Sequence, residues 1–200
     1  ADKNVKEIIL TGVNIGDFGK STNESFYDLI RELDKVGGIE RYRISSIEPQ
    51  LLTEDIIKFV KDSNRFVPHF HLPLQAGTDK MLKAMKRRYS TDLFKQKLDL
   101  INSFMPDAGI GIDLIVGFPG ETVKDFERSY NFLKSLNFSY LHTFSYSDRP
   151  GTVSFDYADK VEKQEISRRS KVLRKLSDEK KEKFYNLYVD KSKEVLFEQY

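Results

Sequence analysis

Five short segments rich in β-branched and aromatic residues alternate with stretches of helical periodicity, and this alternation constrains the fold more than any other feature. The β-type segments are 7–14, 41–47, 69–75, 110–117 and 140–147. Strand–helix repeats of this length require right-handed crossovers, which make the strands parallel. The pattern predicts an α/β fold, either an open doubly wound sheet or part of a barrel.

Helices are predicted between the strands and after the last one. An apolar series at helical spacing runs from Phe26 to Leu33, and Ser21 followed by Glu24 resembles a capping box before it. Thr122 is predicted to cap a later helix. A long charged helix is expected from about 162 to 188, and the segment 192–200 begins like a further strand.

The middle strands are predicted to carry a polar face. Strands of parallel sheets are usually buried on both faces, whereas here apolar side chains alternate with polar or missing ones. Polar groups buried without partners cost free energy, so we expect this face to hold a ligand; the alternative is a self-satisfied network of His71, Arg43, Asp113 and Glu48. The face comprises Arg41, Arg43, Ser45, His69, His71, Gln75, Gly111, Asp113, Ile115 and Gly117.

Composition excludes several classes of chemistry. The 200 residues contain no cysteine, which rules out disulfides and thiolate ligands from this chain and makes the cytoplasm the expected location. No apolar run approaches the ~18 residues of a membrane span, so no membrane association is expected. Residues 160–193 hold 12 Lys/Arg against 6 Asp/Glu. This basic arm indicates a polyanionic partner, with a solvated helix face as the alternative.

Two histidines on one strand raise the question of a metal. The spacing His69-x-His71 is typical of metal-dependent barrel hydrolases, and Asp113 would complete a two-histidine, one-carboxylate set. Such sites usually draw more histidines from later strands, and only His142 remains. The sequence therefore disfavours a metal site here.

The turn after the fourth β-type segment resembles a phosphate-binding loop in its glycines only. Pro119 removes one backbone N–H, and Glu121 places a negative charge where an anion would sit. Phosphate binding is therefore disfavoured. Gly111 and Gly117 lack side chains on the inner face, which predicts that a flat ligand approaches the backbone there.

Five segments in order resemble one known family. They read LTGVNIGDFG (10–19), RISSIEP (43–49), FHLPLQAGTDKMLKAMKRRY (70–89), DLIVGFPGET (113–122) and YLHTFSYSDRPGT (140–152). Over nearly its whole length the chain is similar to the radical S-adenosylmethionine methylthiotransferases. The sequences SSIEP, FHLPLQ and SYLHTFSYS resemble the branch that acts on threonylcarbamoyladenosine beside the anticodon of tRNA.

The resemblance implies a fold and a chemistry. The fold would be a partial (β/α)6, TIM-like radical-SAM barrel lacking its first strand, followed by a long C-terminal helix. The parent enzyme would use a [4Fe–4S] cluster and S-adenosylmethionine to abstract a hydrogen from C2 of the adenine, where a methylthio group is inserted. It would also have a second [4Fe–4S] cluster in an N-terminal domain, a C-terminal TRAM barrel, the tRNA anticodon stem-loop as substrate and a reductant such as flavodoxin.

The resemblance also implies which residues contact the cofactor. The segment 11–14 lies where the family holds the methionine amino end, and Arg87 would meet the carboxylate as a bidentate donor. The segment 113–117 lies where the adenine packs. The implied cofactor-binding residues are Thr11, Gly12, Val13, Asn14, Ser46, Glu48, Gln75, Arg87, Asp113, Ile115 and Gly117.

The chain departs from the family in its cysteines. Family members carry a C-x-x-x-C-x-x-C loop after their first barrel strand, whereas this sequence has no cysteine and enters what would be the second strand. We therefore expect a piece of a longer protein that contains neither metal ligands nor catalytic residues and is inactive alone. Its expected parts are a partial radical-SAM core at 1–155, a basic helical segment at 156–190, and the start of the TRAM domain at 191–200.

Three other functions remain open from the sequence. Sibling branches of the family act on isopentenyladenosine in tRNA or on an aspartate of a ribosomal protein. A chain without cluster ligands but with a basic helix is also compatible with a non-catalytic tRNA-binding module.

Overall fold

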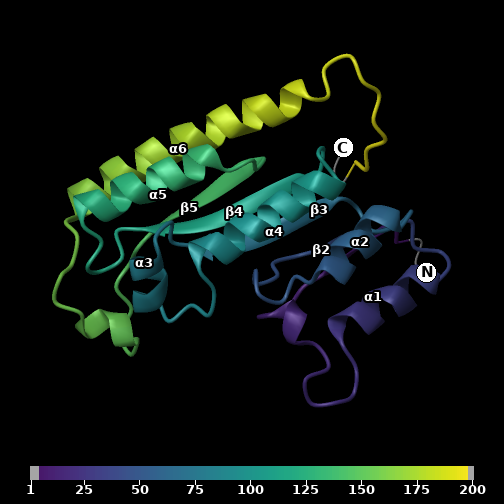
Figure 1. Cartoon of the computed structure of the whole chain (residues 1–200), viewed down its shortest axis with the longest axis horizontal. Helices are drawn as coiled ribbons and strands as arrows, with labels where there is room; N and C mark the ends of the chain where they lie inside the picture. Colours follow the sequence, from purple (N-terminus) through teal and green to yellow (C-terminus); the bar gives the residue numbers. More distant parts are fainter. Residues whose placement is uncertain (1–4, 198–200) are drawn as a thin grey trace.

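The computed structural model describes residues 5–197 and shows strands alternating with helices along the chain (Figure 1). All five predicted strands and the predicted helices between them are present. In order, the elements are β1 (Glu7–Leu10), η1 (Ile15–Asp17), α1 (Phe26–Lys35), β2 (Arg41–Ile44), α2 (Glu54–Asp62), β3 (His69–Gln75), α3 (Asp79–Ala84), α4 (Thr91–Phe104), β4 (Gly109–Val116), α5 (Val123–Ser135), β5 (Tyr140–Ser145), η2 (Val153–Asp156) and α6 (Lys163–Asn186).

Every strand pair is parallel, as predicted. β1 pairs with β2, and β3, β4 and β5 form a second sheet in that order. Isolated bridges from Tyr42 to Phe66 and from Ser46 to His71 connect the two sheets. Within residues 5–197 the strands do not close into a barrel, so the observed architecture is an open part of one.

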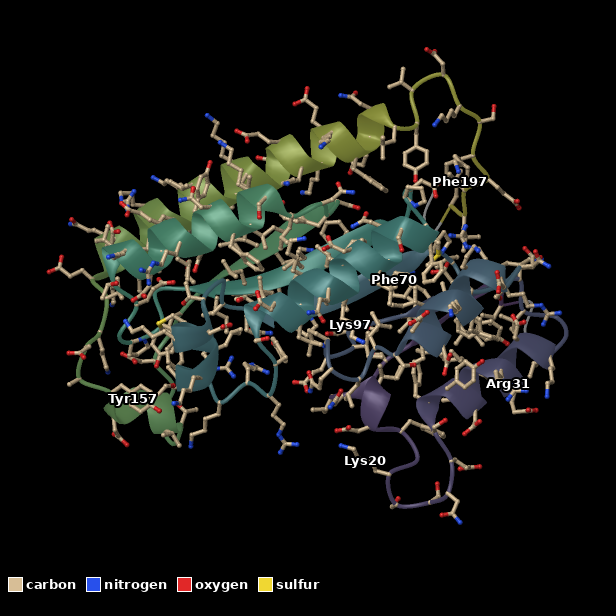
Figure 2. The ribbon with its side chains drawn as sticks, viewed as in Figure 1. Lys20, Arg31, Phe70, Lys97, Tyr157 and Phe197 are labelled. Carbon is tan, nitrogen blue, oxygen red and sulfur yellow. The ribbon has the colours of Figure 1, made fainter. Side chains whose placement is uncertain are left out.

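The outer face of the sheet is apolar, and the helices cover it. Along β4, Ile110, Ile112, Leu114 and Val116 are all buried and belong to the main core. Phe70 of β3 is fully buried between the sheet and its helices (Figure 2). The alternation read from the sequence is therefore the real division between a core face and a polar inner face.

Helix caps follow local sequence signals, with one exception. Thr122 caps α5 and exchanges hydrogen bonds with Asp125, so that cap is confirmed. The capping box predicted at Ser21 is wrong, because α1 is capped by Ser25 together with Asp28. Gly19 has a φ of +80° and its carbonyl accepts from the Thr22 amide, so this segment forms a turn before the helix begins.

Helix α6 covers the free edge of β5 and runs beside α5 (Figure 1). Ser177 Oγ accepts a hydrogen bond from the Leu141 amide at 2.9 Å and donates one to the Leu141 carbonyl at 3.0 Å. Lys180 donates to the carbonyls of Lys134 and Leu136 at the end of α5, and its burial lowers its pKa. A side chain thus satisfies the strand edge that would otherwise be open to pairing with another chain.

Two further expectations concern the last residues of the chain and membrane-spanning helices. The strand predicted from residue 192 is not formed over residues 192–197, and residues 198–200 lie outside the described part. In the described residues, no helix combines the length and the apolar character needed to cross a membrane.

We predict that Ser177→Ala lowers the free energy of unfolding by about 2 kcal/mol, because it leaves a buried amide and a buried carbonyl of β5 unpaired. Urea unfolding followed by circular dichroism measures the change. Ser103→Ala is the matched control, since its hydroxyl bonds an exposed helix carbonyl, and its effect should stay within about 0.5 kcal/mol. Equal effects of the two substitutions would contradict this account of the β5 edge.

Candidate functional site

The carboxyl ends of the parallel strands share one edge of the structure, which is where barrel enzymes place their sites. At this edge Glu48 follows β2 and Arg87 follows α3. Arg87 Nη1 lies 3.5 Å from Glu48 Oε1, and Gln50 donates to the other oxygen of Glu48. Two residues 39 positions apart, both predicted as site residues, are therefore brought together.

Arg87 also lines a pocket together with Ile115, which belongs to the segment 113–117 predicted to pack against the adenine. Arg87, Ile115, Phe118 and Tyr157 line a pocket of about 220 Å³. The ring of Phe118 meets that of Tyr157 edge-on at 6.1 Å, and Tyr157 lies beside η2 (Figure 2). Two residues predicted for the cofactor site, Arg87 and Ile115, thus line the same pocket, whereas the two aromatic residues were not singled out from the sequence.

The predicted residues after β1 stand apart from this group. Asn14 Nδ2 donates to Asp17 Oδ2 at 2.7 Å, so the side chain is held by its own turn. Thr11 and Gly12 are exposed, and Val13 is fully exposed. Among residues 5–197 no hydrogen bond or ion pair joins the segment 11–14 to Glu48 or Arg87.

Gln75 ends β3 in an unusual backbone conformation. Its φ is +67°, in the left-handed region that non-glycine residues rarely occupy, and the ladder with β4 shifts between Pro73 and Gln75. The Tyr89 hydroxyl donates to the carbonyl of Pro73 at 2.6 Å and lies 3.2 Å from that of Leu74. Burial raises the pKa of Tyr89. Tyr89 thus fixes the bulge that sets the direction of Gln75, a role the sequence does not reveal.

A polar layer crosses the inner face of β3, β4 and β5. His71 Nε2 lies 2.8 Å from Asp113 Oδ1, and His142 Nδ1 lies 3.3 Å from the same oxygen. Of the network considered as the alternative to a ligand, the contact between His71 and Asp113 is present, whereas Arg43 pairs with Glu7 and Glu48 pairs with Arg87. Ser46 touches this layer through its backbone bridge to His71.

The donor set of this layer resembles the one considered for a metal, with one member exchanged. One ligand atom each from His71, Asp113 and His142 lies within 4.8 Å of the others. His69 is outside the group, because its Nε2 pairs with the Tyr140 hydroxyl at 2.9 Å. Side chains on one strand at i and i+2 share a face, but the neighbouring strands decide which of them converge.

The two glycines predicted to clear space for a ligand serve internal packing instead. A Cβ on Gly111 would lie 2.4 Å from the Tyr140 ring, and one on Gly117 would lie 2.4 Å from Ile166 of α6. Gly117 also has a φ of +81°. That part of the prediction is wrong, because both spaces are already filled by side chains of this chain.

The turn after β4 is closed by a buried ion pair. Glu121 Oε2 accepts from the Gly117 amide at 2.7 Å and from Arg169 Nη1 at 2.7 Å, and both charged side chains are at least 95% buried. Burial raises the pKa of Glu121, while the Gly117 amide and Arg169 act in the opposite direction. The carboxylate thus takes the amide that a phosphate would need, in agreement with the prediction that this turn is not a phosphate loop.

Five parallel strands with helices outside and polar side chains at the strand ends define an α/β protein of the partial-barrel type. The sequence model of the Radical SAM superfamily matches residues 1–133, and the chain belongs to this superfamily. Coproporphyrinogen III oxidase (HemN) from Escherichia coli shares the fold, with a TM-score of 0.62, 16% identity, and coverage of 77% of this chain and 37% of its own.

Curated relatives carry methylthiotransferase or synthase names. Threonylcarbamoyladenosine tRNA methylthiotransferase MtaB of Bacillus subtilis is 37% identical over 99% of this chain and 44% of its own length. The protein of the same name from Aquifex aeolicus is 36% identical over 92% and 45%. The tRNA-2-methylthio-N(6)-dimethylallyladenosine synthase of Corynebacterium diphtheriae is 38% identical over 84% and 34%. The chain spans less than half the length of these relatives.

The superfamily implies S-adenosylmethionine, and the strand-end residues fit it. Arg87 Nε, Gln50 Oε1 and Asn14 Oδ1 are buried and have no hydrogen-bond partner in the described part of the chain. Buried polar atoms normally have partners. A guanidinium, a carboxylate and amide oxygens suit the carboxylate, ammonium and hydroxyl groups of that cofactor. The superfamily also implies a [4Fe–4S] cluster, which does not fit, because thiolates hold such clusters and this chain has no cysteine.

We predict that His69 makes the fold less stable in acid. Burial, followed by the charges of Arg43 and His71, lowers the pKa of His69 to about 4. Between pH 6.5 and 4 the unfolded chain binds a proton that the folded chain does not, so stability falls as the pH falls, by up to about 3 kcal/mol from this group.

His69→Gln isolates this contribution, because glutamine keeps a polar partner for Tyr140 but does not titrate. Urea unfolding of both proteins at pH 7 and pH 4.5 gives the comparison. The variant should lose less stability than the parent between the two values. Parallel losses in both proteins would show that His69 is not responsible.

Proposed function

We propose that the chain is the central part of a tRNA methylthiotransferase that acts at C2 of N6-threonylcarbamoyladenosine. The observation that carries the proposal is the 36–37% identity, over 92–99% of the chain, to relatives named for this reaction. The second candidate is the dimethylallyladenosine branch, whose relatives reach 38% identity over a smaller share of the chain.

The proposed role of this chain is to hold S-adenosylmethionine and the target nucleoside at the strand ends. S-adenosylmethionine supplies the radical chemistry of the superfamily when it is bound. Arg87 would bind its carboxylate, with Glu48 keeping the guanidinium in place at 3.5 Å, and the segment 11–14 would receive the amino end. Gln75, Asp113 and Ile115 would flank the adenine and the substrate base.

The partners belong to the same proposal. The substrate would be the anticodon stem-loop of a tRNA, the electron donor a protein such as flavodoxin, and the location the cytoplasm. The names of the relatives and the basic segment at 160–193 support tRNA as the substrate; the stem-loop, the electron donor and the location complete the proposal. The cluster ligands would come from a part of the protein outside these 200 residues.

Mass spectrometry of tRNA nucleosides tests the activity. Deleting the gene that encodes the chain should abolish the methylthio form of threonylcarbamoyladenosine and leave that of isopentenyladenosine unchanged. The gene supplied on a plasmid should restore it. Loss of the isopentenyladenosine product instead would assign the protein to the second candidate function.

Cofactor binding by this chain is predicted to depend on Arg87. Arg87→Ala should weaken S-adenosylmethionine binding about tenfold or more, because a charged hydrogen bond contributes about 1.5–3 kcal/mol. Isothermal titration calorimetry gives the dissociation constants. Arg88→Ala removes the same charge from the exposed neighbour and should leave the affinity unchanged. Equal weakening by both substitutions would contradict a direct contact between Arg87 and the cofactor and would indicate a general effect of charge.

A further inference from the structure

One face of α6 carries a regular stripe of basic and hydroxyl side chains. Lys163, Ser167, Lys171 and Arg174 follow one another at intervals of four, four and three residues, which places them on one side of a helix. All four are exposed. At 1.5 Å per residue the stripe is about 16 Å long. This length is greater than that of one phosphate group and matches several consecutive phosphates of a nucleic-acid strand.

The stripe forms one wall of a groove of about 800 Å³ at the carboxyl end of β5. The opposite wall is the segment 145–148, which follows directly from that strand. Two acids also line the groove: Asp148, which pairs with Lys160 at 3.0 Å, and Glu162. Lys163, Lys171 and Arg174 have no ion-pair partner among residues 5–197, so the groove keeps an excess of positive charge.

A buried hydroxyl in the same groove is unsatisfied. Ser170 is only 3% exposed, lines the groove, and its Oγ has no hydrogen-bond partner within the described residues. Buried hydroxyls without a partner are rare because they lose the hydrogen bonds that water gave them. A phosphate oxygen in the groove would accept this hydrogen bond beside the cations of the stripe.

We propose that this groove binds the phosphodiester backbone of the RNA substrate where the RNA passes the carboxyl ends of the β-strands. The inference rests on the proposed function and deepens it. The groove lies at the end of β5, at the same edge as Arg87 and Gln75. A backbone held along α6 would fix the position of a nucleotide that enters the inner face.

Salt-dependent binding tests the proposal. The unmodified chain is titrated into a fluorescent anticodon stem-loop at several salt concentrations. The double variant Lys171→Ala/Arg174→Ala should bind about tenfold more weakly at low salt. Its plot of log K against log salt should be shallower by about 1.4–1.8, since each lost phosphate contact contributes about 0.7–0.9. Alanine favours helix, so α6 should remain intact, as circular dichroism will show.

The matched control removes two cations outside the groove. Lys124→Ala/Lys175→Ala lowers the charge equally at exposed sites without ion pairs in the described structure, and should change the salt slope little. Equal slopes for the two double variants, or no stem-loop binding by the unmodified chain, would overturn the proposal that the groove binds RNA. The nucleoside mass spectrometry is independent of this result and judges the proposed function separately.

Ser170→Ala separates a ligand contact from a structural one. If the hydroxyl serves RNA, the substitution weakens stem-loop binding but leaves the melting temperature of the free chain unchanged or higher, because a buried unsatisfied group is removed. A lower melting temperature with unchanged binding would contradict the proposal. Inorganic phosphate at constant ionic strength is the last arm: displacement of the RNA at millimolar phosphate would indicate a site for free phosphate instead.

Discussion

The ion pair between Glu121 and Arg169 holds together the parts of the structure on which the site depends. Removing two charges from water costs several kcal/mol per ion, so a buried pair persists only where further hydrogen bonds complete it. Here the Gly117 amide and the Glu121 carbonyl provide them, and Glu165 pairs with Arg169 Nε at 2.8 Å. The turn after β4 is therefore fixed by α6, and Ile166 fills the space that Gly117 leaves.

The two faces of the sheet differ in what they contact. The outer face is sealed by apolar packing, while the inner face keeps His71, Asp113 and His142 in one layer with Arg87 and Glu48 toward the strand ends. Tyr89 adds rigidity by holding the bulge before Gln75. The strands that carry His71, Asp113 and His142 thus have their positions determined from the opposite side.

The sequence predicted what local signals determine and missed what only the fold brings together. Segments rich in β-branched and aromatic residues located all five strands, and Thr122 marked a helix start, where the structure shows a capping box with Asp125 that is complete within four residues. Ser21 with Glu24 satisfies the same motif, but Ser25 lies directly before the buried Phe26 and takes the cap. No local pattern reports that Glu121 meets a residue 48 positions away, or that Gly111 makes room for Tyr140.

The same distinction changes what the basic composition of α6 means. Three of its cations are already engaged: Arg169 in the core pair, Arg168 with Glu165, and Lys180 on carbonyls at the end of α5. The local excess of positive charge therefore overstates the surface open to a polyanion. What remains on the wall of the groove is Lys163, Lys171 and Arg174, next to a hydroxyl that nothing in the described chain satisfies. Position on the helix, rather than net charge, is therefore what supports the proposed RNA contact at this face.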